Sequence, residues 1–355
     1  SASTVEHGAS INFTGESGAY LRLSQTVGGT CAAGSWSGLT YTIASIETNC
    51  SVEFSYLPNT YRTQVLFPFN TGSYHTVVAP DGGNVYMLSY NNGQIYNYVR
   101  NDETGQLSAS THFSEGSSSG ATDMQFLRDG SGAYIANHGS DRITFVTRLL
   151  GESGRLQYSG NFDLQAVGSA NSYPMAILLS PDERFVYVHS GMSQSIYVLA
   201  RNPEDNTLSY VATTQTPNYL DAPFLLPLSS SQHIEFAADG NYLLVASLNN
   251  TAVLVYARDA ATGELSLVQI EDGPTGVNYF TLTISDDSRH VYVGSDDING
   301  QLKAYDFDAA TGTLDNYRTI PVDTAGSSAV TNLILMDHSQ YLAVGKSGAD
   351  GSFAV

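Results

Sequence analysis

Apolar and polar positions along the chain follow one recurring pattern, in which a short apolar strand, a polar turn centred on aspartate and a second apolar strand succeed one another. Six segments carry it: APDGGNVYML at 79–88, LRDGSGAYIA at 127–136, SPDERFVYVH at 180–189, AADGNYLLVA at 237–246, SDDSRHVYVG at 285–294 and MDHSQYLAVG at 336–345. The turn aspartates, which lie 48, 53, 57, 48 and 50 residues apart, are Asp81, Asp129, Asp182, Asp239, Asp287 and Asp337. A repeat of this length predicts one propeller blade of four short antiparallel strands per segment.

A further strand and a second polar turn follow each of the first five segments. These turns are NDETGQL from Asn101, LGESGRL from Leu150, NPEDNTL from Asn202, DAATGEL from Asp259 and DAATGTL from Asp308. They begin 20 or 21 residues after the turn aspartate of the same segment, so length varies only between segments. Their residue types predict tight reversals with side-chain caps and positive φ at glycine. Calcium binding explains them less well, because each turn supplies too few spaced carboxylates.

The last segment reaches Val355 before its second turn, which the spacing would place near position 357. The segment TYRTQVLFPFN at 60–70 has the β-branched and aromatic composition of an outer strand. We therefore expect it to complete the last blade, so that residues 58–355 form a closed propeller of six blades without open sheet edges. The alternative is a longer native chain with a seventh blade.

Composition agrees with an all-β fold. Of 355 residues, 42% are hydrophobic and 11% aromatic, which is enough for a large core, and 33 Gly and 23 Tyr are typical of turn-rich β-structure. Acidic residues outnumber basic ones by 34 to 14, for a net charge of -20. Such a surface repels phosphate backbones and anionic lipid, so we expect neither nucleic acid nor a membrane as a partner. No apolar stretch approaches the roughly 18 residues of a membrane span.

Two runs within the repeats resemble a known family. SPDERFVYV at 180–188 and YDFDAATGTL at 305–314 are similar to the "SPDGRFLYVAN" and "YDIDPATGALT" runs of the lactonase-like β-propeller family. The resemblance covers about positions 60–355. It implies the propeller fold and allows a lactone-hydrolysing activity, although propeller folds host many functions.

Residues 1–57 differ in character and contain no aspartate-turn repeat. They resemble a small β-repeat found in tandem on secreted and surface proteins of bacteria. The matching residues are Tyr20, Gly29, Thr30, Cys31, Tyr41, Thr42, Ile43, Ile46, Cys50, Val52 and Phe54. We expect a separate small β-domain at 1–57, joined to the propeller by a connector too short to allow free domain motion.

The two cysteines, Cys31 and Cys50, lie in segments that we expect to be neighbouring strands. Their spacing fits neither a CxxC motif nor a zinc site. A disulfide is favoured, which the resemblance to the secreted repeat also supports and which implies an oxidising, exported compartment. The alternative is a pair of buried free cysteines.

Few residues of the sequence suggest catalysis or ligand binding. The sequence contains no GxSxG, HExxH, P-loop, GxGxxG or EF-hand motif. The loops between repeats vary in length, and in a propeller they meet on one face, so we expect ligand binding there. Candidate ligand-binding residues are Tyr74, His75, Tyr173, Tyr219, Gln232, His233, Asn278 and Tyr279. If the protein is an enzyme, His75 and His233 are the candidate catalytic residues; otherwise such residues simply cap strand ends.

One loop offers a weak metal site. SDDING at 295–300 places Asp296, Asp297 and Asn299 in one turn, where they could bind Ca²⁺ or simply be solvated. No other cofactor is expected.

The sequence favours an exported bacterial protein whose propeller is a binding or adhesion module at the cell surface or in the extracellular matrix. Its partner would be a glycan or a surface protein, or a further copy of the chain. Two alternatives remain: a lactonase-type hydrolase acting in a pocket on the loop face, and a structural subunit of an extracellular filament or array.

Overall fold

The computed structural model describes residues 8–14, 21–37, 40–58, 73–89, 92–114, 120–167, 172–191, 193–215, 234–247, 252–274, 277–295, 301–322, 329–336, 341–346 and 353–354. Strands dominate these residues, with three short 3-10 turns at His138–Ser140, Leu150–Glu152 and Leu164–Val167. No helix in these ranges has the length and apolarity that a membrane crossing requires.

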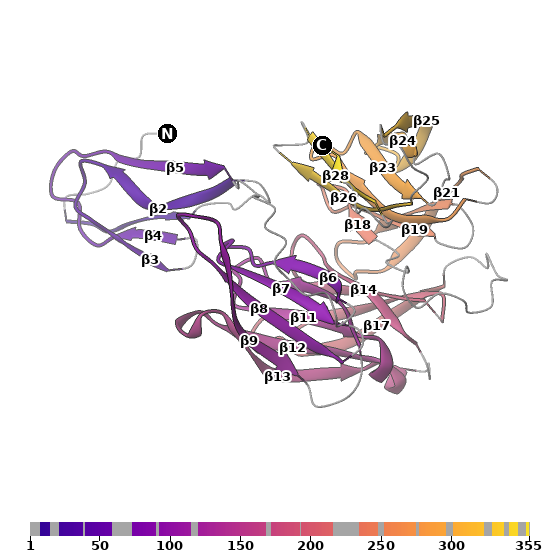
Figure 1. Cartoon of the computed structure of the whole chain (residues 1–355), viewed down its shortest axis with the longest axis horizontal. Coiled ribbons are helices and arrows are strands. Elements are labelled where there is room, and N and C mark those ends of the chain that lie inside the picture. Colours follow the sequence, from indigo (N-terminus) through magenta and orange to yellow (C-terminus); the bar gives the residue numbers. More distant parts are fainter. Residues whose placement is uncertain are drawn as a thin grey trace.

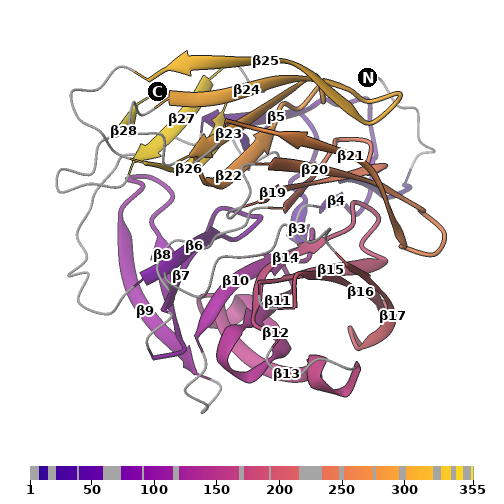
Figure 2. The same cartoon turned by 90° about the vertical axis from the view of Figure 1, so that its right-hand side faces the viewer.

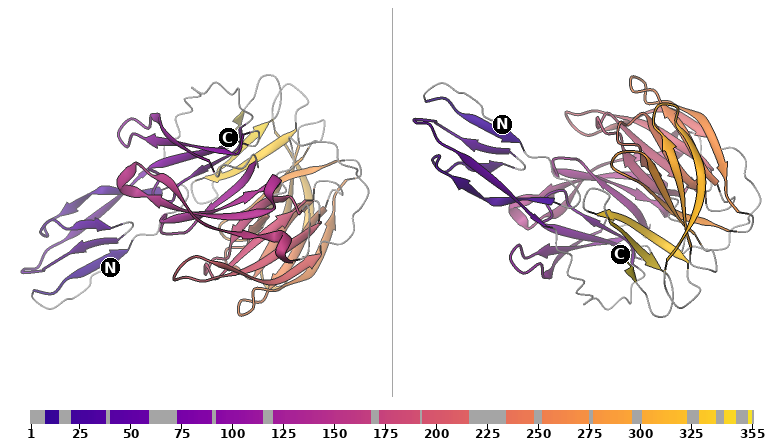
Figure 3. Two further views of the ribbon diagram at one scale, coloured as in Figure 1. Left: turned by 90° about the horizontal axis from the view of Figure 1, so that it is seen from below. Right: turned by 90° about the horizontal axis from the view of Figure 1, so that it is seen from above.

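The N-terminal region forms two small antiparallel sheets (Figure 1). One contains β1 (Ile11–Thr14), β4 (Thr40–Ile43) and β3 (Ser35–Ser37), and the other pairs β2 (Leu21–Gly29) with β5 (Val52–Pro58). Figure 3 shows these strands beside the main body of the molecule.

A disulfide joins Cys31 to Cys50, with the two Cα atoms 4.8 Å apart, which confirms the predicted bond. The strand that precedes Cys31 ends at Gly29, whose φ is +109°. A Cβ at this position would come 2.1 Å from the carbonyl oxygen of Ser51, so only glycine lets the two chain segments approach there.

From Ser73 on, the residues that the structure describes form six antiparallel sheets, which we call blades 1 to 6. Blade 1 contains β6 (Ser73–Val78), β7 (Asn84–Ser89), β8 (Gln94–Arg100) and β9 (Leu107–Ser114). Blade 2 contains β10 (Ala121–Phe126), β11 (Gly132–Asn137), β12 (Arg142–Leu149) and β13 (Arg155–Asp163). Blade 3 contains β14 (Pro174–Leu179), β15 (Phe185–Ser190), β16 (Ser195–Arg201) and β17 (Leu208–Gln215).

The remaining blades repeat this order of strands. Blade 4 contains β18 (Ile234–Phe236), β19 (Tyr242–Ser247), β20 (Ala252–Arg258) and β21 (Leu265–Asp272). Blade 5 contains β22 (Tyr279–Ile284), β23 (His290–Ser295), β24 (Gln301–Asp308) and β25 (Thr313–Pro321). Blade 6 is described as three strands, β26 (Val330–Met336), β27 (Tyr341–Lys346) and β28 (Phe353–Ala354).

The blades surround a common centre, with first strands innermost and fourth strands at the periphery (Figure 2). We call the end of the blades that carries the aspartate turns the turn end. The opposite end, where each first strand begins, is the connector end. The all-β propeller predicted from the repeats is thereby confirmed.

Apolar clusters join neighbouring blades and explain why the repeated runs are continuously apolar. The second strands β11 and β15 are buried at every position, because another blade packs on each of their faces. Each cluster contains apolar residues of two neighbouring blades. Examples are Leu88 and Ile135 for blades 1 and 2, Ala136 and Ile177 for blades 2 and 3, Tyr187 and Val245 for blades 3 and 4, Val255 and Leu282 for blades 4 and 5, and Leu302 and Val344 for blades 5 and 6.

The aspartate turns have the predicted local structure. In all five turns that the structure describes, the aspartate side chain accepts the N–H two residues later, as Asp239 does from Asn241 at 3.0 Å. The expected sixth aspartate, Asp337, lies outside the described residues. The closing segment at 60–70 does so too, and its pairing with blade 6 stays a prediction.

Candidate functional site

The first strands carry a local irregularity at the connector end. Their register shifts between Ser73 and His75, Ala121 and Asp123, Pro174 and Ala176, Tyr279 and Thr281, and Val330 and Asn332. Bulges re-aim side chains and are frequent beside active sites. His75, Asp123, Ala176 and Thr281 each lie six residues before the turn aspartate of their blade, so the bulges bring equivalent positions to one level of the propeller.

Two of these equivalent positions form a polar pair across neighbouring blades. Nδ1 of His75 lies 3.3 Å from Oδ1 of Asp123, and the two side chains are 38% and 16% exposed. Asp123 is fixed by backbone: its Oδ1 accepts the N–H of Met124 at 2.8 Å, and its Oδ2 accepts the N–H of Ile177 on β14 at 2.9 Å. The carboxylate of Asp123 therefore contacts residues of blades 1, 2 and 3, and these contacts fix its orientation.

The pair has the arrangement of a general base. A fixed carboxylate beside Nδ1 favours the tautomer that carries the proton on Nδ1, which leaves Nε2 of the imidazole as a proton acceptor. A partly exposed pair of this kind adds about 1 kcal/mol or less to stability, so stability alone gives little reason for it. The structure thus brings the imidazole of the predicted candidate His75 next to an acid.

Glu235 adds a second carboxyl group to the inner strands. Burial raises the pKa of Glu235 to about 8, against smaller opposing effects of hydrogen bonds from the Thr283 side chain and the Ile284 backbone of β22. Among the residues that the structure describes, its Oε2 is buried without a hydrogen-bond partner. At neutral pH this carboxyl group is therefore mainly protonated.

Tyr173 lies on the same connector end, in a left-handed conformation with φ of +50°. Asp141 fixes it by accepting the Tyr173 N–H at 2.8 Å and the Gln165 amide at 3.0 Å. The Tyr173 ring packs 4.3 Å from that of His138, and burial lowers the pKa of this histidine despite nearby Asp141. These contacts join the loop after β11 of blade 2 to the residues that lead into blade 3.

The other predicted site residues have different positions. Tyr279 is fully buried and its hydroxyl lies 2.8 Å from that of Tyr305, so it belongs to the core between blades 4 and 5. Asn278 precedes it on the connector. The Tyr74 side chain and the whole of Tyr219, Gln232 and His233 lie outside the described residues, as do the calcium candidates Asp296, Asp297 and Asn299. Within the described ranges, no group of three or more potential ligands could hold a metal ion.

The sequence analysis missed Asp123 and Glu235. A signal for Asp123 was present, because it lies six residues before its turn aspartate, as do both His75 and His233. Glu235 lies two residues after His233. Burial raises its pKa, and the sequence alone does not show which residues are buried.

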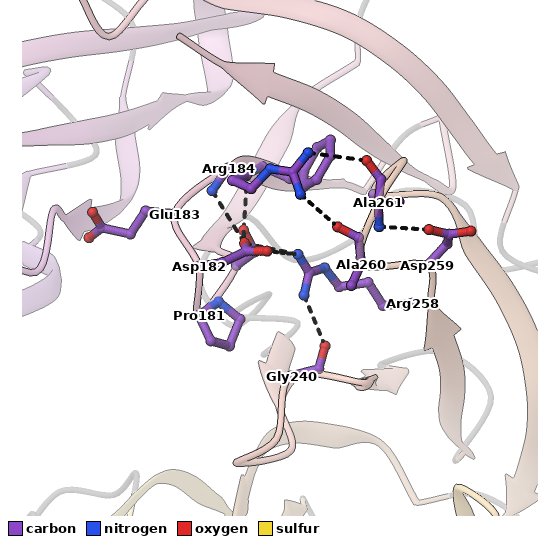
Figure 4. Close-up of polar contacts among 12 residues, drawn as sticks. Pro181, Asp182, Glu183, Arg184, Gly240, Arg258, Asp259, Ala260 and Ala261 are labelled. Carbon is purple, nitrogen blue, oxygen red and sulfur yellow. Dashed lines mark hydrogen bonds and ion pairs between the residues drawn. The ribbon is translucent and has the colours of Figure 1, made fainter. Parts of the chain in front are cut away.

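The turn end contains a different kind of charged group. Arg258 of blade 4 is 4% exposed and reaches back to blade 3, where it donates to both carboxylate oxygens of Asp182 at 2.9 and 2.7 Å (Figure 4). It also donates to the Tyr187 hydroxyl at 3.1 Å and the Gly240 carbonyl at 3.3 Å. Burial by itself raises the pKa of Asp182, but hydrogen bonds from Ser180 and Arg258 outweigh it and lower the pKa.

Blades 1 and 2 repeat this contact. Arg148 donates to Asp81 at 2.9 Å, to the Asn84 side chain at 2.6 Å and to the Tyr86 hydroxyl at 3.1 Å. We call these two buried contacts arginine latches. Both arginines are buried and paired with groups of the preceding blade, so the latches serve assembly of the ring rather than ligand binding.

Comparisons with known proteins agree with this architecture. The family model "Lactonase, 7-bladed beta-propeller" matches residues 71–279. No curated protein sequence gives a significant match to the chain.

Many solved structures are similar to the chain, and three of them illustrate the likeness. A periplasmic gluconolactonase from Pseudomonas aeruginosa is 20% identical with a TM-score of 0.59, over 80% of this chain and 84% of that one. A protein from Bacteroides uniformis, provisionally assigned as a 6-phosphogluconolactonase, is 19% identical with a TM-score of 0.60, over 76% and 75%. A protein from Lactobacillus plantarum is 17% identical with a TM-score of 0.59, over 72% and 73%. At these identities the likeness shows the fold alone.

Proposed function

We propose, on the premise that the chain belongs to the lactonase family of seven-bladed β-propellers, that its connector end hydrolyses a lactone. The observation that carries the proposal is the His75–Asp123 pair, 3.3 Å apart on the inner strands of two neighbouring blades. A binding surface has no need for a histidine whose Nδ1 faces a carboxylate fixed by two backbone N–H groups.

The chemistry needs one base that later acts as an acid. Nε2 of His75 takes a proton from water while the water oxygen bonds to the lactone carbonyl carbon. The tetrahedral intermediate then collapses, the ring C–O bond breaks, and the imidazolium returns its proton to the departing ring oxygen. The product is the open hydroxy acid. Asp123 does not accept a proton; it orients the imidazole and stabilises its charged form.

A panel of sugar lactones tests this proposal by titration of the released acid. We expect His75→Ala to lower kcat by about 10²–10⁴-fold, the usual contribution of a positioned base. Asp123→Asn should lower kcat with little change in KM, because it removes orientation and not binding. His112→Ala is the matched control, since this histidine lies on the fourth strand β9 against Tyr96. Turnover that is unaffected by His75→Ala would overturn the assignment.

A second candidate function is an exported binding or adhesion module at the bacterial cell surface. It is supported by the disulfide-bonded N-terminal region beside the propeller and by connectors of unequal length. In this proposal the connector end recognises a glycan or a surface protein. Glycan and protein arrays with and without millimolar Ca²⁺ test it and also test the candidate calcium loop. Array binding that persists in a His75→Ala variant without lactone turnover would favour recognition over hydrolysis.

A further inference from the structure

The outer strands of blades 2 and 3, β13 and β17, each carry a bulge with an exposed tyrosine directly before it. The register of β13 shifts between Tyr158 and Gly160, and that of β17 shifts between Tyr210 and Ala212. Tyr158 is 50% exposed and Tyr210 is 44% exposed. The two tyrosines therefore occupy equivalent positions at the periphery of neighbouring blades (Figure 2).

A side-chain hydrogen bond holds each of the two rings in place. Side chains alternate between the faces of a strand, but the extra residue of a bulge returns the residue three positions further on to the same face. The Asn161 amide donates to the Tyr158 hydroxyl at 2.8 Å, and the Tyr210 hydroxyl lies 3.0 Å from the Thr213 hydroxyl. These bonds keep each phenol along its strand. A ring that lies along an outer strand presents one of its faces to solvent.

The surface around both rings is polar but uncharged. β17 has the sequence LSYVATTQ, without a charged residue, and β13 has charged residues only at its ends, Arg155 and Asp163. Between these ends, the exposed Gln157, Ser159 and Asn161 provide amide and hydroxyl groups. The whole chain has 34 acidic and 14 basic residues, so two neighbouring outer strands of this composition form a distinct surface.

The other outer strands that the structure describes do not combine these features. The position of Tyr158 is taken by Ala109 in blade 1 and by Leu267 in blade 4. Leu267 is 43% exposed and apolar, but it has no aromatic ring. In blade 5 the bulge is flanked by the charged residues Asp315 and Arg318. An oriented ring in uncharged polar surroundings is therefore a feature of blades 2 and 3 within the described outer strands.

We propose that Tyr158 and Tyr210 are stacking platforms for the pyranose units of a neutral polysaccharide. The C–H face of a pyranose packs on an aromatic ring, while its hydroxyl groups exchange hydrogen bonds with amide and hydroxyl side chains. Because both tyrosines are already oriented, little side-chain freedom is lost on binding. Anionic polysaccharides are disfavoured by the net charge of -20.

The two platforms lie on neighbouring blades, so a polymer long enough to reach both binds more tightly than a short oligosaccharide. This surface is separate from the connector end. The proposal therefore does not depend on lactone hydrolysis or on recognition by the connectors.

Native gel electrophoresis of the whole protein in gels that contain a polysaccharide tests the proposal. Hydroxyethyl cellulose and glucomannan, which are neutral, should retard the protein, and the anionic alginate should not. Tyr158→Ala and Tyr210→Ala should each lower the affinity about fivefold, through loss of one stacked ring, and the double variant should migrate as in a gel without polymer. Leu267→Ala is the matched control and should behave as wild type, because it removes an equally exposed side chain at the same position of blade 4.

Two further variants sharpen the result. Tyr210→Phe keeps the ring but loses its hydrogen bond, so its affinity should lie between those of wild type and Tyr210→Ala. His75→Ala, at the connector end, should be retarded as wild type. Thermal unfolding confirms that all variants fold.

Three outcomes overturn the proposal. The first is a wild type that neither neutral polymer retards, and the second is retardation that survives the double substitution. The third is an equal loss of affinity in Leu267→Ala, which would indicate a general apolar surface for a protein partner.

Discussion

The turn end and the connector end of the propeller use charged groups in opposite ways. At the turn end, Arg148 and Arg258 are 2% and 4% exposed at the side chain, and each pairs with an aspartate of the preceding blade. At the connector end, His75 is 38% exposed and meets a single fixed carboxylate. A buried, fully paired charge is committed to structure, whereas a half-exposed imidazole held by an acid remains available for a ligand. The comparison separates the scaffold from the candidate site in blades 1 and 2, where both kinds of charged group occur.

Breaking a latch should have the largest effect on stability. Arg258→Met leaves Asp182 without its partner between blades 3 and 4, and we expect a loss of about 3 kcal/mol, the lower end for a broken buried pair, because Asp182 keeps some solvent access. Urea unfolding, compared at equal m-value, measures it.

Arg184→Ala provides the control on the same surface. Arg184 donates to the Ala260 and Ala261 carbonyls at 3.2 and 3.3 Å but is exposed, so its removal should cost about 1 kcal/mol or less. Equal losses in the two variants would mean that the latch contributes no more than a surface contact.

The sequence repeats predicted the blades well because the residues that specify each blade lie close together in the sequence. An aspartate that caps its own turn and a continuous apolar run between two packed blades both leave a mark within ten residues of sequence. The disulfide was predictable for the same reason. The latches were not, because Arg148 and Asp81 are 67 residues apart and their pairing depends on how one blade packs against the next.

The candidate site was predicted only in part. His75 was found from its place before a strand, but its partner Asp123 comes from the next blade, and Tyr279 appeared equally suitable although its hydroxyl is buried against Tyr305. Which face of a strand reaches a ligand depends on bulges that the sequence does not reveal.

A buried carboxyl group on the inner strands, that of Glu235, makes the stability of the folded chain depend on pH, which gives a further test of how the two ends of the propeller differ. Its carboxyl group has a pKa of about 8 in the folded chain, well above that of an exposed glutamate. As pH rises above about 4.5, the unfolded state loses this proton while the folded state keeps it, so folding becomes less favourable until the pH passes the folded value. The stability that this group contributes is complete at low pH and is lost by about pH 8.

Glu235→Gln should remove that pH dependence. We expect the variant to gain stability relative to wild type as pH increases from 5 to 8, measured by urea unfolding at each pH. Glu152→Gln, at a glutamate 58% exposed at the turn end, should follow wild type throughout. Parallel curves for wild type and Glu235→Gln would show that the carboxyl group is solvated and ionised in the folded chain.

The smallest effect on stability is expected at the connector between blades 3 and 4. Residues 216–233 join blade 3 to blade 4, between the end of β17 at Gln215 and the start of β18 at Ile234. Replacing residues 216–231 by the four residues of 273–276 shortens this loop and retains Gln232 and His233. Loop-closure entropy varies slowly with length, so the free energy of unfolding should change by about 1 kcal/mol or less. If the connector end recognises the substrate, KM for the best lactone of the panel should rise at least tenfold with kcat little changed. A large loss of stability would place this connector with the scaffold, and an unchanged KM would confine recognition to the inner strands around His75.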